Sequence, residues 1–260
     1  MQTKLEYYRN NILKVGCWVR SSEQVRFYLN KALWEVTGYP WTKLSPKPLE
    51  ELFPGIENLA DSIEVVHPFS RLRGTSVELD ELIVILSILR FTKAKRVIEI
   101  GTFDGNTTLN LALNVGEDGE IVTIDLPPSS DESRKNGNTD LRQPSKFDKR
   151  QYVGHPRGDI IRQVYGDSMA VDWSTVGDGF DLAYIDGDHT EPYVRSDTEN
   201  VLKVIRPGGV VVWHDYEYRA VSAVLDKAAS RGVPIHWVSK TRIAVGIFAD
   251  PFANIEYFCD

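Results

Sequence analysis

The 260-residue sequence has only two cysteines, Cys17 and Cys259, and they match no metal-binding or redox spacing. Two cysteines near opposite ends exclude a disulfide framework, and this scarcity is typical of a reducing compartment. The longest apolar run, residues 82–91, is too short to span a bilayer. Residues 1–16 show no signal-peptide pattern. These absences predict a cytoplasmic protein without a membrane partner.

Basic charge is also scarce. The chain has 30 lysines and arginines against 37 aspartates and glutamates, a formal net charge of −7. Nucleic-acid-binding proteins usually carry a basic surface, so we expect no nucleic-acid partner and favour a small-molecule ligand. The length allows one large domain with a smaller attachment. A monomer and a homo-oligomer both remain open.

Short apolar segments alternate with helical patterns from residue 76 onward. A helix is predicted over residues 76–90, and strands are predicted at residues 97–100, 120–125, 161–165, 180–185, 210–213, 234–239 and 243–248. Strands separated by helices indicate a parallel sheet, whereas the last two strands are joined by a short loop and form an antiparallel hairpin. The fold class is therefore α/β, with a doubly wound, mostly parallel seven-stranded sheet.

Two segments fall outside this alternation. Residues 1–75 are expected to form an N-terminal helical cap on a ligand-binding domain of residues 76–260. A polar insertion at residues 127–159 is expected to be either a lid or an inert loop. Aromatic residues of the cap would shape an acceptor pocket or form the cap's own core; they are Trp18, Trp34, Tyr39 and Trp41.

The residues that follow the strands are the candidates for chemistry, because doubly wound sheets bind ligands at the carboxyl ends of their strands. After the first strand, Gly101 and Gly105 allow a tight turn near a ligand. Phe103 and Asn106 stand where the nicotinamide fingerprint requires glycine, which disfavours a dehydrogenase. Asp125, at the tip of the second strand, would accept hydrogen bonds from two ribose hydroxyls or cap a turn.

The sequence Gly166-Asp167-Ser168 follows the third strand. It offers an acceptor and a hydroxyl suited to an adenine edge, or an N-cap for the next helix.

Taken together, these motifs resemble class I S-adenosylmethionine-dependent methyltransferases, especially the methyltransferase-24 and macrocin or catechol O-methyltransferase-like groups, over about residues 76–250. The resemblance implies S-adenosylmethionine as cofactor, with Glu99, Gly101 and Gly105 around its methionine part. The cofactor-binding residues expected on this basis are Glu99, Gly101, Thr102, Phe103, Gly105, Thr107, Asp125, Leu126, Gly166, Asp167, Ser168 and Asp186.

Asp186 and Asp215 follow the fourth and fifth strands, which are neighbours in this topology, so both carboxylates can face one cleft. This arrangement suggests a divalent cation such as Mg²⁺. By resemblance the ligands would be Asp186, His214 and Asp215. His214 departs from the metal-dependent relatives, and its imidazole favours Mn²⁺, Fe²⁺ or Zn²⁺. In the alternative without a metal, Asp186 binds near the cofactor and His214 is a strand-end histidine.

His189 follows Asp186 by three residues, the spacing at which catechol O-methyltransferase-like enzymes place a lysine base. His189 and His214 are therefore the candidate catalytic bases. Alternatively, His189 belongs to a helix cap before Pro192. The predicted reaction is methyl transfer to an oxygen, less often a nitrogen, of a small-molecule acceptor. The alternatives are a non-catalytic subunit or sensor with this fold and a nucleotide-dependent oxidoreductase.

Overall fold

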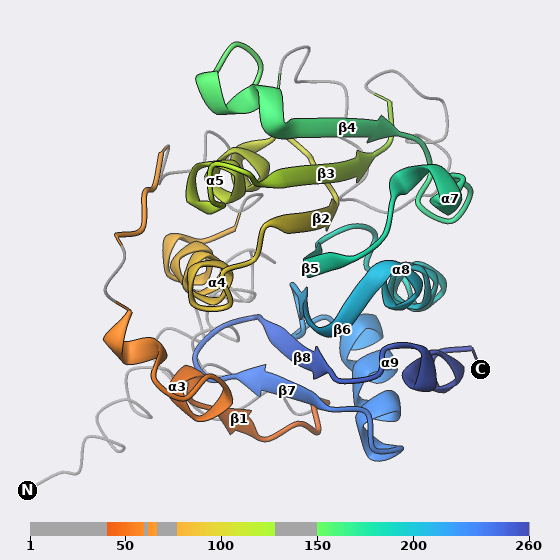
Figure 1. The fold of residues 1–260 in the computed structure, drawn as a ribbon. Coiled ribbons are helices and arrows are strands. Elements are labelled where there is room, and N and C mark those ends of the chain that lie inside the picture. The colour runs from red at the N-terminus through yellow and green to blue at the C-terminus, as the bar shows by residue number, and fades with distance from the viewer. Residues whose placement is uncertain (1–40, 60–61, 67–76, 128–149, 260) are drawn as a thin grey trace, which may run out of the picture. The chain divides into compact units, whose positions relative to one another are not determined.

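The structure, a computed structural model, describes residues 41–59, 62–66, 77–127 and 150–259. Within these ranges one sheet has the strand order β1-β7-β8-β6-β5-β2-β3-β4 (Figure 1). Strand β8 is antiparallel to β6 and β7, and the other pairings are parallel. The predicted doubly wound sheet with a C-terminal antiparallel hairpin is confirmed. The strands are β1 (Pro46–Lys47), β2 (Arg96–Ile100), β3 (Glu120–Asp125), β4 (Ile161–Tyr165), β5 (Phe180–Ile185), β6 (Ile205–Trp213), β7 (Ile235–Val238) and β8 (Ala244–Phe248).

Helices cover both faces of this sheet. Helices α4 and α5 lie on one side, and α8 and α9 lie on the other (Figure 1). The α-helices are α3 (Leu49–Leu52), α4 (Leu79–Phe91), α5 (Asn106–Asn114), α7 (Trp173–Val176), α8 (Glu191–Val204) and α9 (Arg219–Ser230). Short 3₁₀ turns are η2 (Ile56–Asn58), η5 (Pro156–Ile160) and η6 (Phe252–Tyr257). No helix in the described ranges is long and apolar enough to cross a membrane.

The central strands are mostly apolar and are buried along nearly their whole length. Val97 and Ile98 in β2 and Leu182 and Ala183 in β5 are fully buried. Parallel strands covered by helices on both faces have this continuous pattern rather than an alternating one. Burying each large aliphatic side chain contributes about 1.5–3 kcal/mol, so these strands fix the middle of the sheet.

Part of the segment predicted as a cap belongs to the sheet. Strand β1 pairs with β7, with Pro46 opposite Trp237 and Lys47 opposite Val238. This eighth strand was not predicted, because two residues that include a proline give no strand periodicity. Trp41 donates an indole hydrogen bond to the carbonyl oxygen of Glu217 (2.7 Å). Trp18, Trp34, Tyr39 and the boundary at residues 75 and 76 lie outside the described residues, so the division into cap and domain stays a prediction.

The predicted insertion at 127–159 is described only at its two ends. At its second end, Gln151 donates hydrogen bonds from its backbone and side chain to Asp104 (2.8 and 2.6 Å). The Tyr152 hydroxyl donates to Gln163 on β4 (2.6 Å). Residues 151–152 are therefore attached to the loop that follows β2.

That loop begins at Gly101, whose φ of +96° is unfavourable for a residue with a side chain. A Cβ atom at this position would lie 2.0 Å from the carbonyl oxygen of Asp186. The Gly101 amide donates to the carbonyl of Ile124 (2.9 Å), and the Asp186 amide donates to the carbonyl of Ile100 (2.9 Å). Gly101 thus allows the ends of β2, β3 and β5 to meet.

We predict that Gly101→Ala destabilises the protein by about 3 kcal/mol or more, because the added methyl group meets main-chain atoms and the backbone conformation is strained. Urea unfolding followed by circular dichroism measures this change. Gly116→Ala is the matched control, since a Cβ atom there meets no other atom within 4 Å. Equal midpoints for both variants would contradict the packing role of Gly101.

Candidate active site at the carboxyl ends of the strands

Glu99, near the end of β2, lies at the centre of a buried hydrogen-bond network beside the loop that begins at Gly101. Its Oε2 atom accepts hydrogen bonds from the hydroxyls of Thr108 (2.5 Å) and Thr123 (2.6 Å). Its Oε1 atom is buried and has no hydrogen-bond partner among the described residues. Burial raises the pKa of Glu99 to about 8, with a smaller contribution from the charges of Asp186 and Asp125. A buried acceptor without a donor suits a ligand that brings an N–H group.

Asp125 ends β3 and receives three hydrogen bonds. Its Oδ2 atom accepts from the Phe103 amide (2.9 Å) and from Arg150 Nη2 (2.8 Å), and its Oδ1 atom accepts from the Leu126 amide (2.8 Å). Burial raises the pKa of Asp125, and the Arg150 guanidinium opposes that increase. The structure therefore brings together the expected residues Phe103, Asp125 and Leu126. Arg150 was not predicted, because no local motif marks a residue at the end of a long polar insertion.

The other expected residues of the loop contact the neighbouring strands and Tyr152. The Thr102 and Thr123 hydroxyls share a hydrogen bond (2.7 Å), and Thr102 also accepts from Gln163 (3.1 Å). Gly105 has a φ of +79°, and a Cβ atom there would lie 2.8 Å from the Tyr152 ring. Thr107 lies in the first turn of α5, half-buried. The Thr102 hydroxyl is thus bonded within the protein.

The end of β4 is held beside the end of β3, since the Gly166 amide donates to the carbonyl of Asp125 (2.9 Å). The Asp167 carboxylate accepts from the Met169 amide (2.9 Å) and from the Tyr193 hydroxyl (3.0 Å). Ser168 is buried. Asp167 therefore stabilises the local turn and lies at the expected edge of the sheet.

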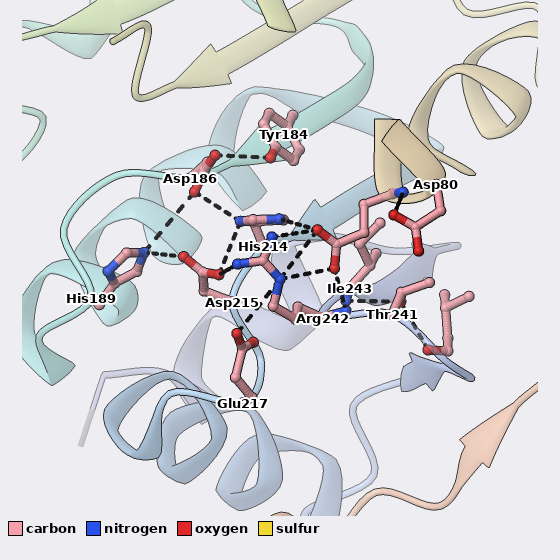
Figure 2. Close-up of polar contacts among 12 residues, drawn as sticks. Asp80, Tyr184, Asp186, His189, His214, Asp215, Glu217, Thr241, Arg242 and Ile243 are labelled. Carbon is pink, nitrogen blue, oxygen red and sulfur yellow. Dashed lines mark hydrogen bonds and ion pairs between the residues drawn. The ribbon is translucent and has the colours of Figure 1, made fainter. Parts of the chain in front are cut away.

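Asp186, His189 and Asp215 form a cluster at the ends of β5 and β6, which we call the Asp-His-Asp cluster (Figure 2). One potential ligand atom from each residue lies within 4.8 Å of the other two. His189 Nε2 is 2.9 Å from Asp215 Oδ2 and 4.0 Å from Asp186 Oδ1. The His189 ring stacks on Tyr218 with a centroid distance of 4.6 Å. The side chains of His189 and Asp186 are 16% and 23% exposed, whereas both ring nitrogens of His189 are buried.

His214 lies behind this cluster with both ring nitrogens occupied. Its Nδ1 atom is 3.2 Å from Asp186 Oδ1 and 3.2 Å from Asp215 Oδ1 (Figure 2). Its Nε2 atom is 3.1 Å from Glu81 Oε2. Although burial opposes it, Asp215 and Asp186 raise the pKa of His214 well above its usual value. Both ring nitrogens of His214 thus face carboxylate oxygens, and the cation ligand set that the geometry favours contains His189 instead of His214.

Two further charged residues lie beside His214 and Asp215, the buried Glu81 and the half-buried Arg242. Arg242 donates to both carboxylate oxygens of Glu81, with the shortest contact at 2.6 Å, and to Asp215 Oδ1 at 2.9 Å. Burial opposes ionisation of Glu81, but His214 and Arg242 lower its pKa to about 2. Glu81 was missed because it lies on α4 and follows no strand, and only the tertiary structure brings it to His214.

Two non-glycine residues of the site have a left-handed backbone, Phe103 with a φ of 48° and Asp215 with a φ of 54°. Such conformations cost of order 1–3 kcal/mol and occur often at functional sites. Both residues place polar groups at the site: the Phe103 amide at Asp125, and the Asp215 carboxylate at His189.

Known methyltransferases are similar to this chain in sequence. Residues 98–216 match the methyltransferase domain of the Methyltransf_24 family. A caffeoyl-CoA O-methyltransferase of Populus kitakamiensis is 24% identical over 185 residues, covering 71% of this chain and 68% of that protein. A flavonoid 3',5'-methyltransferase of Vitis vinifera is 28% identical over 190 residues, covering 71% and 69%.

Solved structures show the same fold. The O-methyltransferase TomG of Streptomyces achromogenes, in complex with S-adenosylmethionine, aligns with a TM-score of 0.51 at 16% identity, covering 87% of this chain and 99% of that one. The S-adenosylhomocysteine-bound methyltransferase PaMTH1 of Podospora anserina has a TM-score of 0.52 at 13% identity, covering 88% and 97%. The matched methyltransferase domain and the curated relatives set aside the oxidoreductase and the non-catalytic alternatives. The chain is a class I S-adenosylmethionine-dependent methyltransferase.

Proposed function

We propose that this methyltransferase transfers the methyl group to a hydroxyl oxygen of a small-molecule acceptor bound at the Asp-His-Asp cluster. The observation that carries this proposal is the convergence of Asp186, His189 and Asp215 beside the loop that starts at Gly101. The names of the curated relatives support a phenolic acceptor, since they act on caffeoyl-CoA and on flavonoids. The Asp-His-Asp cluster would bind and deprotonate such a hydroxyl.

The loop after β2 fits the cofactor. Gly101 and Gly105 keep side chains out of the turn, and the unpaired Oε1 atom of Glu99 suits the ammonium group of the methionine part. When bound, S-adenosylmethionine supplies an electrophilic methyl group. We assign cofactor binding to the residues Glu99, Gly101, Thr102, Phe103, Gly105, Thr107, Asp125, Leu126, Gly166, Asp167, Ser168 and Asp186.

Proton removal is assigned to His189. Its Nε2 atom faces both carboxylates of the cluster, and Asp215, at 2.9 Å, stabilises the imidazolium that forms when His189 takes the proton of the acceptor. His214 is not assigned this role, because both of its ring nitrogens already face carboxylate oxygens, of Asp186 and Asp215 on one side and of Glu81 on the other. Its role is to keep the two aspartates together. Holding the hydroxyl oxygen close to the methyl donor reduces the barrier by at most about 7–11 kcal/mol.

The same three residues fit a divalent cation, which is the second candidate role of the cluster. Asp186, His189 and Asp215 would hold it, with one imidazole and two carboxylates as donors. This donor set favours Mn²⁺, Fe²⁺ or Zn²⁺ over Mg²⁺. Such an ion would lower the pKa of the acceptor hydroxyl. In that case His189 acts as a ligand rather than as the base.

We predict that His189→Ala lowers kcat by about 10²–10⁴-fold, because the group that removes the proton or holds the cation is lost. The affinity for S-adenosylhomocysteine, measured by calorimetry, should not change. Turnover of a catechol or caffeoyl ester is followed by mass spectrometry. His236→Ala is the control, since His236 lies on β7 and takes no part in the cluster. Turnover by His189→Ala at the wild-type rate would overturn the assignment.

A cation should bind in a way that depends on both aspartates. EDTA-treated protein titrated with Mn²⁺ is expected to show one site, which is lost in Asp186→Asn and in Asp215→Asn and retained in His236→Ala. If the wild-type protein takes up no Mn²⁺ or Zn²⁺, the cation role is wrong and His189 is left as the base.

Because the pKa of Glu99 is raised in the folded protein, the stability of the protein should fall as pH rises. A carboxyl whose pKa is about 8 when folded and 4.5 when unfolded contributes stability that is complete below about pH 4.5 and disappears as pH rises through 8. Glu99→Gln removes this loss, so we expect its Tm in the absence of cofactor to fall less than the wild-type Tm between pH 6 and pH 9. Glu256→Gln, at an exposed position, is the control. Parallel Tm curves for Glu99→Gln and wild type would show that Glu99 is ionised in the folded protein throughout.

A further inference from the structure

We propose that Arg150 is a further cofactor-binding residue, which holds the ribose of S-adenosylmethionine together with Asp125. The proposal rests on the assignment of Asp125 to the ribose. It adds a positively charged donor to a subsite for which the sequence predicted a carboxylate.

Arg150 is a buried cation with unused donors. Its side chain is 3% exposed, and its Nη2 atom donates to Asp125 Oδ2 at 2.8 Å. Its Nε and Nη1 atoms are buried and have no hydrogen-bond partner among the described residues. Leaving buried N–H groups without acceptors is costly. The side chain is therefore suited to a ligand that brings acceptor oxygens to the end of β3.

The hydrogen bonds of Asp125 show why one residue does not suffice for a ribose. An ionised carboxylate has about four lone-pair positions for donors. The amides of Phe103 and Leu126 and the guanidinium of Arg150 occupy three of them. One further hydroxyl can donate to Asp125, so two ribose hydroxyls cannot both do so. Because a hydroxyl also accepts hydrogen bonds, the nearby N–H groups of Arg150 can serve the ribose oxygens.

The residues after Arg150 fix its position. Gln151 makes two hydrogen bonds to Asp104 in the loop after β2. The Tyr152 ring lies so close to Gly105 that a Cβ atom there would be 2.8 Å from it, and its hydroxyl bonds to Gln163 on β4. Arg150 is thus attached through its neighbours to the same loop that is assigned to the cofactor, and these contacts fix the position of its guanidinium.

Calorimetric titration with S-adenosylhomocysteine and with its 2'-deoxy and 3'-deoxy analogues tests this proposal. In Arg150→Met we expect the affinity for S-adenosylhomocysteine to fall by about 10- to 100-fold, the effect of a lost charged hydrogen bond. Removing a ribose hydroxyl should weaken binding to the wild-type protein more than to Arg150→Met. Arg150→Lys keeps the charge and should lie between them. Arg206→Met, which breaks an ion pair with Asp181 away from the site, is the matched control.

Equal deoxy-analogue penalties in wild type and Arg150→Met would overturn the proposal and leave Arg150 as a counter-ion of Asp125. If Arg150→Met does not fold, Arg150→Lys decides by the same comparison. A wild-type protein that binds no S-adenosylhomocysteine would instead overturn the cofactor assignment itself. The two failures are therefore distinguishable.

Discussion

The contact between Gly101 and the main chain of Asp186 is the constraint on which the arrangement of the site depends. Because no atom larger than hydrogen fits between them, the loop after β2 can lie directly against the end of β5. This contact brings the proposed cofactor loop next to the residue that begins the Asp-His-Asp cluster. The backbone hydrogen bonds Gly101 to Ile124 and Asp186 to Ile100 then align three strand ends. The proposed sites for the methyl donor and the acceptor are neighbours because of this one close approach.

Charge is concentrated at the same edge of the sheet. Glu81, His214 and Asp215 are buried and are in contact with Arg242 or with one another, and buried Glu99 and half-buried Asp125 lie along the same edge. Removing one partner of a buried ion pair typically costs about 3–5 kcal/mol, whereas replacing the whole set by apolar groups is often neutral. The pairs are therefore not needed for stability as such. They hold Asp186 and Asp215 close together, since His214 contacts both carboxylates.

The site could be predicted only where a residue follows a strand directly. Asp125, Asp186 and Asp215 were predicted in this way, because parallel strands place their carboxyl ends at one edge. Glu99 lies inside β2 and was expected only from the resemblance. The choice between His189 and His214 could not be made from spacing, since both lie near the same two strand ends. The proposed choice rests on the tertiary structure, in which His189 shares one cluster with the two aspartates and Glu81 of helix α4 contacts the far nitrogen of His214. Arg150 was hidden for a similar reason, since it reaches Asp125 only through the packing of Gln151 and Tyr152.

The sequence by itself determined the order of strands and helices, the parallel sheet with its antiparallel end, and the set of acidic and glycine residues at the strand ends. These features follow from local periodicity and from handedness rules that act along the chain. Tertiary structure alone decided which charges meet. Glu81 and His214 are 133 residues apart in sequence, and Glu81 and Arg242 are 161 apart. Contacts at such separation are set by packing, and no local pattern of residues encodes them.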